Sequence, residues 1–137
     1  MSHADLESLG RRAVACAGWR WMEGMLAVPA PGSEYEGWCR ILRASDDGAV
    51  NSWTDEDGHI LDAEEDGDFA TFADLIPWLG ELVTLGGLLA LAREKWGTVY
   101  AKPEEDRWTV RGPTGHIVGQ GPTEAAALVA ALEVSRG

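Results

Sequence analysis

The residues of this chain best suited to chemistry are carboxylates, and they gather in its middle part. No lysine or arginine occurs between Ala44 and Ala92, and that stretch holds twelve acids: Asp46, Asp47, Asp55, Glu56, Asp57, Asp62, Glu64, Glu65, Asp66, Asp68, Asp74 and Glu81. They account for the whole net charge of −12, because the other eleven acids balance the eleven bases. Such a stretch is typical of a solvated surface, a cation site or a surface for a basic partner. It disfavours binding to DNA or RNA, whose phosphates are negative.

Part of this stretch has the spacing of a calcium-binding EF-hand loop. In Trp53–Glu64, acidic residues stand at loop positions three, five and twelve, and Gly58 stands at position six. Position one normally supplies a carboxylate oxygen, but here it is Trp53, and no helix is expected before it. A hairpin turn at Asp57-Gly58 explains the same residues without a metal ion. We therefore predict no metal site in this segment.

Other signatures of catalysis or metal binding are missing from the sequence. The histidines His3, His59 and His116 are not three or four residues apart, and no further ligand stands at a zinc-site spacing from them. Neither Cys16 nor Cys39 lies in a C-x-x-C motif, so we expect reduced, mostly buried thiols. No serine-nucleophile motif or phosphate-binding glycine loop occurs. We therefore predict a protein that is not an enzyme and needs no cofactor.

Tryptophan is unusually frequent, with seven residues against two phenylalanines and two tyrosines. Three lie in apolar stripes and are predicted core residues: Trp38, Trp78 and Trp96. Three others stand in polar or loop-like contexts: Trp19, Trp21 and Trp53. Arg20 separates the first two of these. Tryptophan beside arginine is typical of protein interface hot spots and of stacking pockets for a base.

The elements that would position these residues begin with a helix over about residues 4–17, capped by Ser2 and stopped by Gly18. A linker rich in proline and glycine follows, and we expect it to form a loop. From Trp38 onward, alternating runs separated by Asp-Gly turns predict a three-stranded antiparallel meander over residues 38–44, 49–54 and 59–63, joined by type I′ turns. An acidic loop comes next, and then a segment that Pro77 limits to one short helical turn.

The strongest helix signal lies at Thr84–Gly97, with Thr84 as the expected N-cap and Gly97 as the glycine that ends the helix. Gly86 and Gly87 inside it predict close packing of the backbone. Residues 98–102, 107–111 and 116–119 predict a second meander. Residues 123–134 predict a last helix, capped by Thr123.

Together these elements predict one α+β domain over residues 1–137. It contains an antiparallel sheet from two three-stranded meanders, each followed by a helix, plus the N-terminal helix. Gly58–Leu61 and Gly115–Val118 read GHIL and GHIV, and they follow Trp38 and Trp96 by 20 and 19 residues. This similarity indicates a weak βββα repeat over about 38–96 and 97–135. Without an apolar run of membrane-spanning length or a leader sequence, we expect a cytoplasmic protein.

Three segments of the chain resemble a group of small uncharacterised proteins encoded in bacteriophages and prophages. They are GWRWMEGML (Gly18–Leu26), LIPWLGELVTLGGLLALAREKWG (Leu75–Gly97) and TEAAALVAALE (Thr123–Glu133), about 45 of 137 residues. In that group a cysteine typically stands where this chain has Gly87, so no role of the cysteine is carried over. The resemblance implies a shared fold, a viral origin and a location in the host cytoplasm. It implies no catalytic residue.

Two functional hypotheses remain open. The first is a phage or prophage accessory protein that binds a protein with a basic surface, such as a host nuclease or defence protein, without a membrane partner. Its predicted binding residues are Trp19, Arg20, Trp21, Asp55, Glu56, Asp57, Glu64, Glu65 and Asp66. The second is a protein that binds or sequesters a small ligand such as a nucleotide. Its predicted ligand-binding residues are Arg20, Trp53, Trp108 and Arg111.

Overall fold

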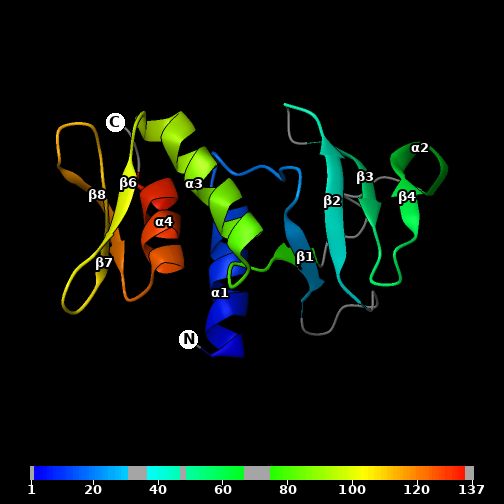
Figure 1. Ribbon diagram of the computed structural model, residues 1–137, viewed down its shortest axis with the longest axis horizontal. Helices are drawn as coiled ribbons and strands as arrows, with labels where there is room; N and C mark the ends of the chain where they lie inside the picture. Colours follow the sequence, from blue (N-terminus) through cyan, green and yellow to red (C-terminus); the bar gives the residue numbers. More distant parts are fainter. Residues whose placement is uncertain (1, 31–36, 47–48, 67–74, 135–137) are drawn as a thin grey trace. The chain divides into compact units, whose positions relative to one another are not determined.

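A computed structural model describes residues 2–30, 37–46, 49–66 and 75–134 of the chain (Figure 1). The chain divides into two compact units. One unit, Arg20–Gly87, contains fifteen acids and three bases and is called the acidic unit below. The other unit, Met1–Trp19 with Leu88–Gly137, contains eight acids and eight bases and is called the neutral unit. The single domain and the internal repeat expected from the sequence stay predictions.

The acidic unit is built on a five-stranded antiparallel sheet in the order β4-β3-β2-β1-β5 (Figure 1). Its strands are β1 (Leu26–Pro29), β2 (Cys39–Ala44), β3 (Val50–Thr54), β4 (Ile60–Asp62) and β5 (Leu75–Pro77). The predicted first meander is confirmed as β2, β3 and β4. Two further strands are corrections to the prediction: β1 replaces a predicted loop, and β5 replaces a predicted helical turn. Proline lacks an N–H for a sheet, but Pro29 and Pro77 are the last residues of their strands, where that loss is tolerated.

Short helices and turns complete the acidic unit. The acidic segment after β4 forms α2 (Ala63–Asp66) rather than the predicted loop. The predicted turn at Asp47-Gly48 and the residues 67–74 lie outside the described residues. Trp53 in β3 pairs with Ile41 in β2, and these two side chains are 0% and 1% exposed, so they form the centre of this unit's core.

The helix α3 (Leu82–Trp96) begins two residues earlier than the predicted N-cap at Thr84. The residue that caps it is Glu81, whose carboxylate accepts the backbone N–H groups of Val83 at 3.2 Å and Thr84 at 3.1 Å. Thr84 is instead wholly buried, and its hydroxyl accepts the backbone N–H of Leu26 at 2.8 Å. A threonine inside the first turn can therefore connect the helix to β1 while a carboxylate satisfies the exposed N–H groups.

Gly86 and Gly87 lie within α3, and Gly97 follows its last residue. A Cβ on Gly87 would lie 2.6 Å from the terminal carbon of Met25, so the predicted close packing is confirmed there. Nothing lies within 4 Å of a Cβ on Gly86, and the prediction is wrong for that residue. Gly97 ends the helix with φ of +83°, as predicted, and its N–H donates to the carbonyl of Arg93 at 2.8 Å.

The neutral unit contains a three-stranded antiparallel sheet in the order β6-β7-β8, which confirms the second predicted meander. Its other elements include two helices that pack on each other, α1 and α4. The bounds are α1 (His3–Val14), β6 (Tyr100–Pro103), β7 (Trp108–Arg111), β8 (Ile117–Gly121) and α4 (Glu124–Glu133). The N-cap predictions at Ser2 and Thr123 are confirmed, whereas α1 ends three residues before the predicted Ala17.

Helix α4 covers one face of this small sheet at very short range. A Cβ on Gly119 would lie 2.4 Å from the carbonyl oxygen of Ala127, and one on Gly121 would lie 2.7 Å from the Cβ of Ala126. Only glycine on β8 permits this approach. The end of α3 is fixed to the same helix, because Lys95 and Trp96 donate to the carbonyls of Leu132 at 2.6 Å and Ala131 at 2.8 Å.

Two hairpins, one in each unit, have the same turn. Asp55–His59 joins β3 to β4, and Gly112–His116 joins β7 to β8. In both, the first residue donates its N–H to the last, and a glycine with positive φ precedes the histidine. Both turns are the three-residue loop with a bulge at glycine, and the two-residue type I′ turn predicted between β3 and β4 is wrong. His59 and His116 stand immediately before β4 and β8.

Candidate functional site

Hydrogen bonds to the Asp55 carboxylate organise the hairpin between β3 and β4. The Asp55 carboxylate accepts the backbone N–H groups of Asp57 at 3.0 Å and His59 at 2.9 Å, and its second oxygen lies 3.2 Å from Nδ1 of His59. These hydrogen bonds, led by the backbone bond from His59, hold the pKa of Asp55 below its usual range. Asp55 therefore shapes the turn as well as adding charge to it.

Glu56 and Asp57 project from the same turn and are exposed. Among the residues that the structure describes, neither carboxylate has a hydrogen-bond or ion-pair partner. Their charge is therefore presented to solvent. In contrast to Asp55, these two residues are available for an external cationic group.

One group of possible metal ligands lies in this turn. Asp55, Asp57 and His59 each offer a ligand atom, and these atoms lie within 4.8 Å of one another. His59 is the third ligand that spacing in the sequence did not identify, because only the bulged turn brings it back to Asp55. A closed zinc site needs four ligands, so the described residues of the turn supply an incomplete set.

The other predicted acids lie at the opposite end of β4. Glu64 and Glu65 are exposed on α2, which follows the end of β4, whereas the hairpin precedes its start (Figure 1). The side chain of Asp66 lies outside the described part of the chain. The predicted acids thus form two groups, one at each end of the edge strand.

Two of the three predicted anchors, Arg20 and Trp21, border a shallow hollow in the acidic unit. It has a volume of about 300 Å³, and its lining includes Arg20, Trp21 and Asp46. The hollow lies where β2 ends, which is the same end of the sheet as α2, because β2 and β4 run in the same direction. Trp19 is half-buried and belongs to the neutral unit.

Two tryptophans exchange the roles expected from the sequence. Trp53 was expected to fit the core less well than its neighbours, but it is 0% exposed. Trp38 was predicted to be a core residue, but 39% of it is exposed. Trp53 and Ile41 are paired across β3 and β2, and their side chains face the core. Trp38 precedes β2, and its side chain lies on the opposite face of the sheet. Neither fact is visible in the local hydrophobic pattern.

The residues predicted for a small ligand lie in both units. Arg20 and the buried Trp53 belong to the acidic unit, and Trp108 and Arg111 belong to β7 of the neutral unit. The Arg111 guanidinium donates to Glu104 at 2.7 Å and to the Gly115 carbonyl at 2.9 Å. Its bond to Glu104 is the main cause that keeps the pKa of this carboxyl below its usual range.

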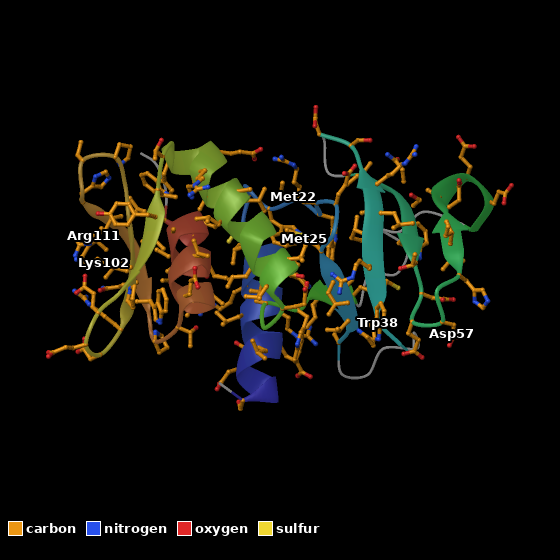
Figure 2. The ribbon with its side chains drawn as sticks, in the orientation of Figure 1. Met22, Met25, Trp38, Asp57, Lys102 and Arg111 are labelled. Atoms are coloured by element: carbon orange, nitrogen blue, oxygen red, sulfur yellow. The ribbon has the colours of Figure 1, made fainter. Side chains whose placement is uncertain are left out.

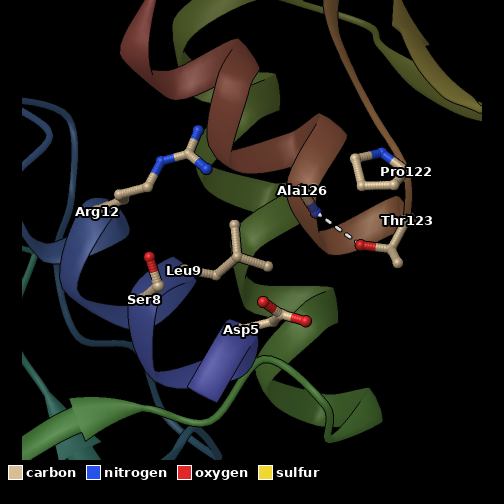
Figure 3. Close-up of a pocket in the computed structure, with 7 residues that line it drawn as sticks. All are labelled: Asp5, Ser8, Leu9, Arg12, Pro122, Thr123 and Ala126. Carbon is tan, nitrogen blue, oxygen red and sulfur yellow. Dashed lines mark hydrogen bonds between the residues drawn. The ribbon is translucent and has the colours of Figure 1, made fainter. Parts of the chain in front are cut away.

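The neutral unit has a pocket of about 370 Å³ between α1 and the start of α4 (Figure 3). It is lined by Asp5, Ser8, Leu9, Arg12, Pro122, Thr123 and Ala126. Asp5 is bonded to Ser2, Arg12 to Glu133, and Thr123 to Ala126. Most of the polar groups in this pocket are therefore engaged in capping and pairing the two helices.

The two cysteines are free thiols, as predicted. Cys39 is buried in β2, and Cys16 is partly exposed after α1. Burial raises the pKa of the Cys16 thiol, which disfavours the thiolate that a nucleophile requires.

No protein family model, curated protein or solved structure matches this chain. No enzyme family or enzyme fold is identified for it by these comparisons. Among the helices that the structure describes, none has both the length and the apolar character needed to cross a bilayer. The case for a function therefore depends on the charges and exposed side chains described above.

Proposed function

We propose that this chain is a non-enzymatic binding protein whose acidic unit engages the basic surface of a protein partner. The observation that carries the proposal is the division of charge. The acidic unit contains fifteen acids and three bases, and the other unit contains eight of each. A single-sign surface of this kind steers and orients the approach of an oppositely charged partner.

The proposed contact residues supply charge and apolar area in different places. Asp55, Glu56 and Asp57 contribute charge at one end of β4, and Glu64, Glu65 and Asp66 contribute it at the other. Trp19, Arg20 and Trp21 contribute aromatic and guanidinium contacts of the kind that dominate binding energy in interfaces. Three of the nine residues are aromatic or arginine anchors, so the interface does not depend on charge alone.

The proposed partner is a host nuclease or defence protein, and the proposed origin of the chain is a phage or prophage. Proteins that bind nucleic acids carry basic surfaces, because they neutralise phosphates. An acidic protein that covers such a surface would prevent nucleic acid from binding there. The resemblance of three segments to phage-encoded proteins supports this origin.

Affinity capture with matched pairs of substitutions tests this proposal. The tagged chain is incubated with a bacterial lysate at low and at high salt, and the retained proteins are identified by mass spectrometry. The two test variants are Glu56→Gln with Asp57→Asn, and Glu64→Gln with Glu65→Gln. The control variant is Glu105→Gln with Asp106→Asn, which removes two exposed neighbouring acids from the neutral unit.

We expect a basic partner at low salt that is reduced at high salt, because screening weakens exposed charge interactions. Combining both test pairs should abolish its capture, and the control pair should leave it unchanged. Capture that survives all four substitutions in the acidic unit contradicts the proposal. The absence of any basic protein at low salt contradicts it as well.

A further inference from the structure

Trp38, immediately before β2, is an exposed aromatic residue next to the acidic hairpin. It is 39% exposed, whereas Trp53 on the neighbouring strand is completely buried. No hydrogen bond or ring contact engages the Trp38 indole within the described ranges of the chain. A large aromatic side chain left in this state offers both a π face and an N–H to a partner.

The strand register places a second apolar side chain on the same face. Arg40 pairs with Thr54, and Thr54 pairs with Ile60. Because side chains alternate along a strand, Trp38 shares the face of Arg40 and therefore that of Ile60. Ile60 is 72% exposed. Two apolar residues thus point to solvent from one face, at the end of the sheet that carries the hairpin.

Carboxylates border this apolar surface. A Cβ on Gly37 would lie 2.7 Å from the carboxyl carbon of Glu56, so the Glu56 side chain lies against the backbone just before Trp38. Asp57 projects from the same turn, and Figure 2 shows Asp57 and Trp38 at the same end of the sheet. Arg40 does not neutralise these acids, because its guanidinium is bonded to the Gly24 carbonyl at 2.8 Å and to Glu81 at 3.2 Å.

Among the described strands, β4 is the edge strand of this sheet. Asp55 and His59 form a hydrogen-bonded pair, so the next such pair along the hairpin is Trp53 with Leu61. The N–H and C=O of Ile60 therefore point away from β3. Among the described strands, none pairs with that side of β4. An extended segment can bond to this edge beside Ile60.

We propose that Trp38, Glu56, Asp57 and Ile60 form a docking surface for an extended, arginine-rich segment of a protein partner. An arginine guanidinium stacks on an aromatic face and pairs with carboxylates, and its methylene groups pack on an apolar side chain. The inference rests on the proposed function, because it specifies which part of the acidic unit recognises the partner. It adds Trp38 to the proposed aromatic anchors Trp19 and Trp21.

Binding of a defined peptide to the full chain tests this surface. The probe is a fluorescein-labelled peptide of five alternating Arg-Val pairs, and binding is followed by fluorescence anisotropy at low salt. The test variants are Trp38→Ala, Trp38→Phe, and Glu56→Gln with Asp57→Asn. The matched controls are Tyr100→Ala, which removes an exposed aromatic residue of the neutral unit, and Glu105→Gln with Asp106→Asn.

We expect Trp38→Ala to weaken the peptide Kd by roughly 5- to 30-fold, since a desolvated cation–π contact contributes at this level. The acidic-hairpin pair should weaken it by roughly 2- to 30-fold, because it removes two exposed ion pairs. Trp38→Phe keeps an aromatic face and should weaken peptide binding less than Trp38→Ala does. The controls should stay within about twofold of the unsubstituted chain, since their side chains lie elsewhere. A Glu-Val peptide of the same length should not bind. Circular dichroism of each variant separates loss of binding from loss of fold.

Failure of this inference is distinguishable from failure of the proposed function. If the unsubstituted chain does not bind the arginine peptide, or if Trp38→Ala binds it equally well, the surface is wrong. Capture of a basic partner from lysate that is lost with the four acids but kept in Trp38→Ala leaves the proposed function standing without this surface. If peptide binding depends on Trp38 but no basic partner is captured from lysate, the result supports the docking surface and contradicts the proposed function.

Discussion

The acidic unit and the neutral unit each contain an antiparallel sheet, but they differ in their balance of charge. The neutral unit has as many bases as acids, and two of its eight acids form ion pairs within the fold: Glu104 with Arg111, and Glu133 with Arg12. The acidic unit has five times as many acids as bases, and its exposed Glu56 and Asp57 have no partner among the described residues. The acids are balanced by bases in the neutral unit and are in large excess in the acidic unit.

The excess of acids should reduce the stability of the acidic unit. Carboxylates that are close together repel one another, and folding brings them closer than in the unfolded chain. The unit is therefore held by its buried residues and by a few well-bonded polar groups, above all Glu81. The comparison predicts that the two units respond differently to the same change, and four experiments test this in order of decreasing effect.

Truncating the central core residue of each unit should have the largest effect. Trp53→Ala removes a wholly buried side chain and should lower the free energy of unfolding by about 3–5 kcal/mol. The matched variant in the neutral unit is Leu128→Ala, with an expected loss of about 2–5 kcal/mol. Hydrogen exchange measured by mass spectrometry should show reduced protection in the substituted unit. Equal loss of protection in both units would instead show that they unfold together.

Removing the Glu81 carboxylate should have the next largest effect. Glu81→Ala removes the acceptor for two N–H groups at the start of α3 and for the Thr84 hydroxyl, so we expect a loss of about 1–2 kcal/mol. Glu81→Gln keeps an acceptor oxygen and should lose less stability than Glu81→Ala does. Chemical denaturation of the two variants gives these values. Equal stability of Glu81→Ala and the original chain would show that water replaces the carboxylate without loss.

The same carboxylate predicts a pH dependence. Burial raises the pKa of Glu81, but the hydrogen bonds from Thr84, Val83 and Arg40 outweigh burial, and the pKa lies below its usual range. A lowered pKa stabilises the fold above the unfolded value of about 4.3, and this stabilisation disappears as the pH falls through the folded value. The stability difference between the original chain and Glu81→Gln should therefore shrink below about pH 4.

The two units should also differ in how their protection from hydrogen exchange responds to salt, but by a smaller amount. Raising NaCl from about 0.01 M to 1 M shortens the Debye length from about 30 Å to 3 Å and screens repulsion between exposed acids. We expect protection from hydrogen exchange to increase in the acidic unit relative to the neutral unit, whose charges balance. A parallel change in both units would indicate a general effect of salt. The neutral unit serves as the internal control in the same sample.

The smallest effect is expected at the Arg12–Glu133 ion pair of the neutral unit. These side chains are 45% and 39% exposed, so Glu133→Gln should cost about 0–1 kcal/mol. The hydrogen bond from Arg12 lowers the pKa of Glu133, so the contribution of the pair is present above the unfolded pKa and lost as the pH falls through the folded one. Thermal unfolding at pH 7 and pH 3.5 measures it. A loss above about 2 kcal/mol would mean that the pair is not the surface interaction described.

The candidate site was predictable only in part. The acidic stretch, the meander that carries it and the histidine at the start of β4 follow from local sequence patterns. The position of Trp38 does not, because WCRIL alternates and either face of that strand could be the buried one. The pairing of Ile41 with Trp53 selects the buried face and exposes Trp38.

By itself the sequence determined the features that depend on neighbours along the chain. The caps at Ser2 and Thr123, the left-handed glycine Gly97 and the hairpins are set by hydrogen bonds between residues a few positions apart. Tertiary structure alone decided that β1 pairs with β5 about fifty residues later, and that Thr84 bonds to Leu26 rather than capping its helix. These contacts join segments that are distant in sequence, and whether they form depends on the free energy of the whole fold rather than on any local pattern.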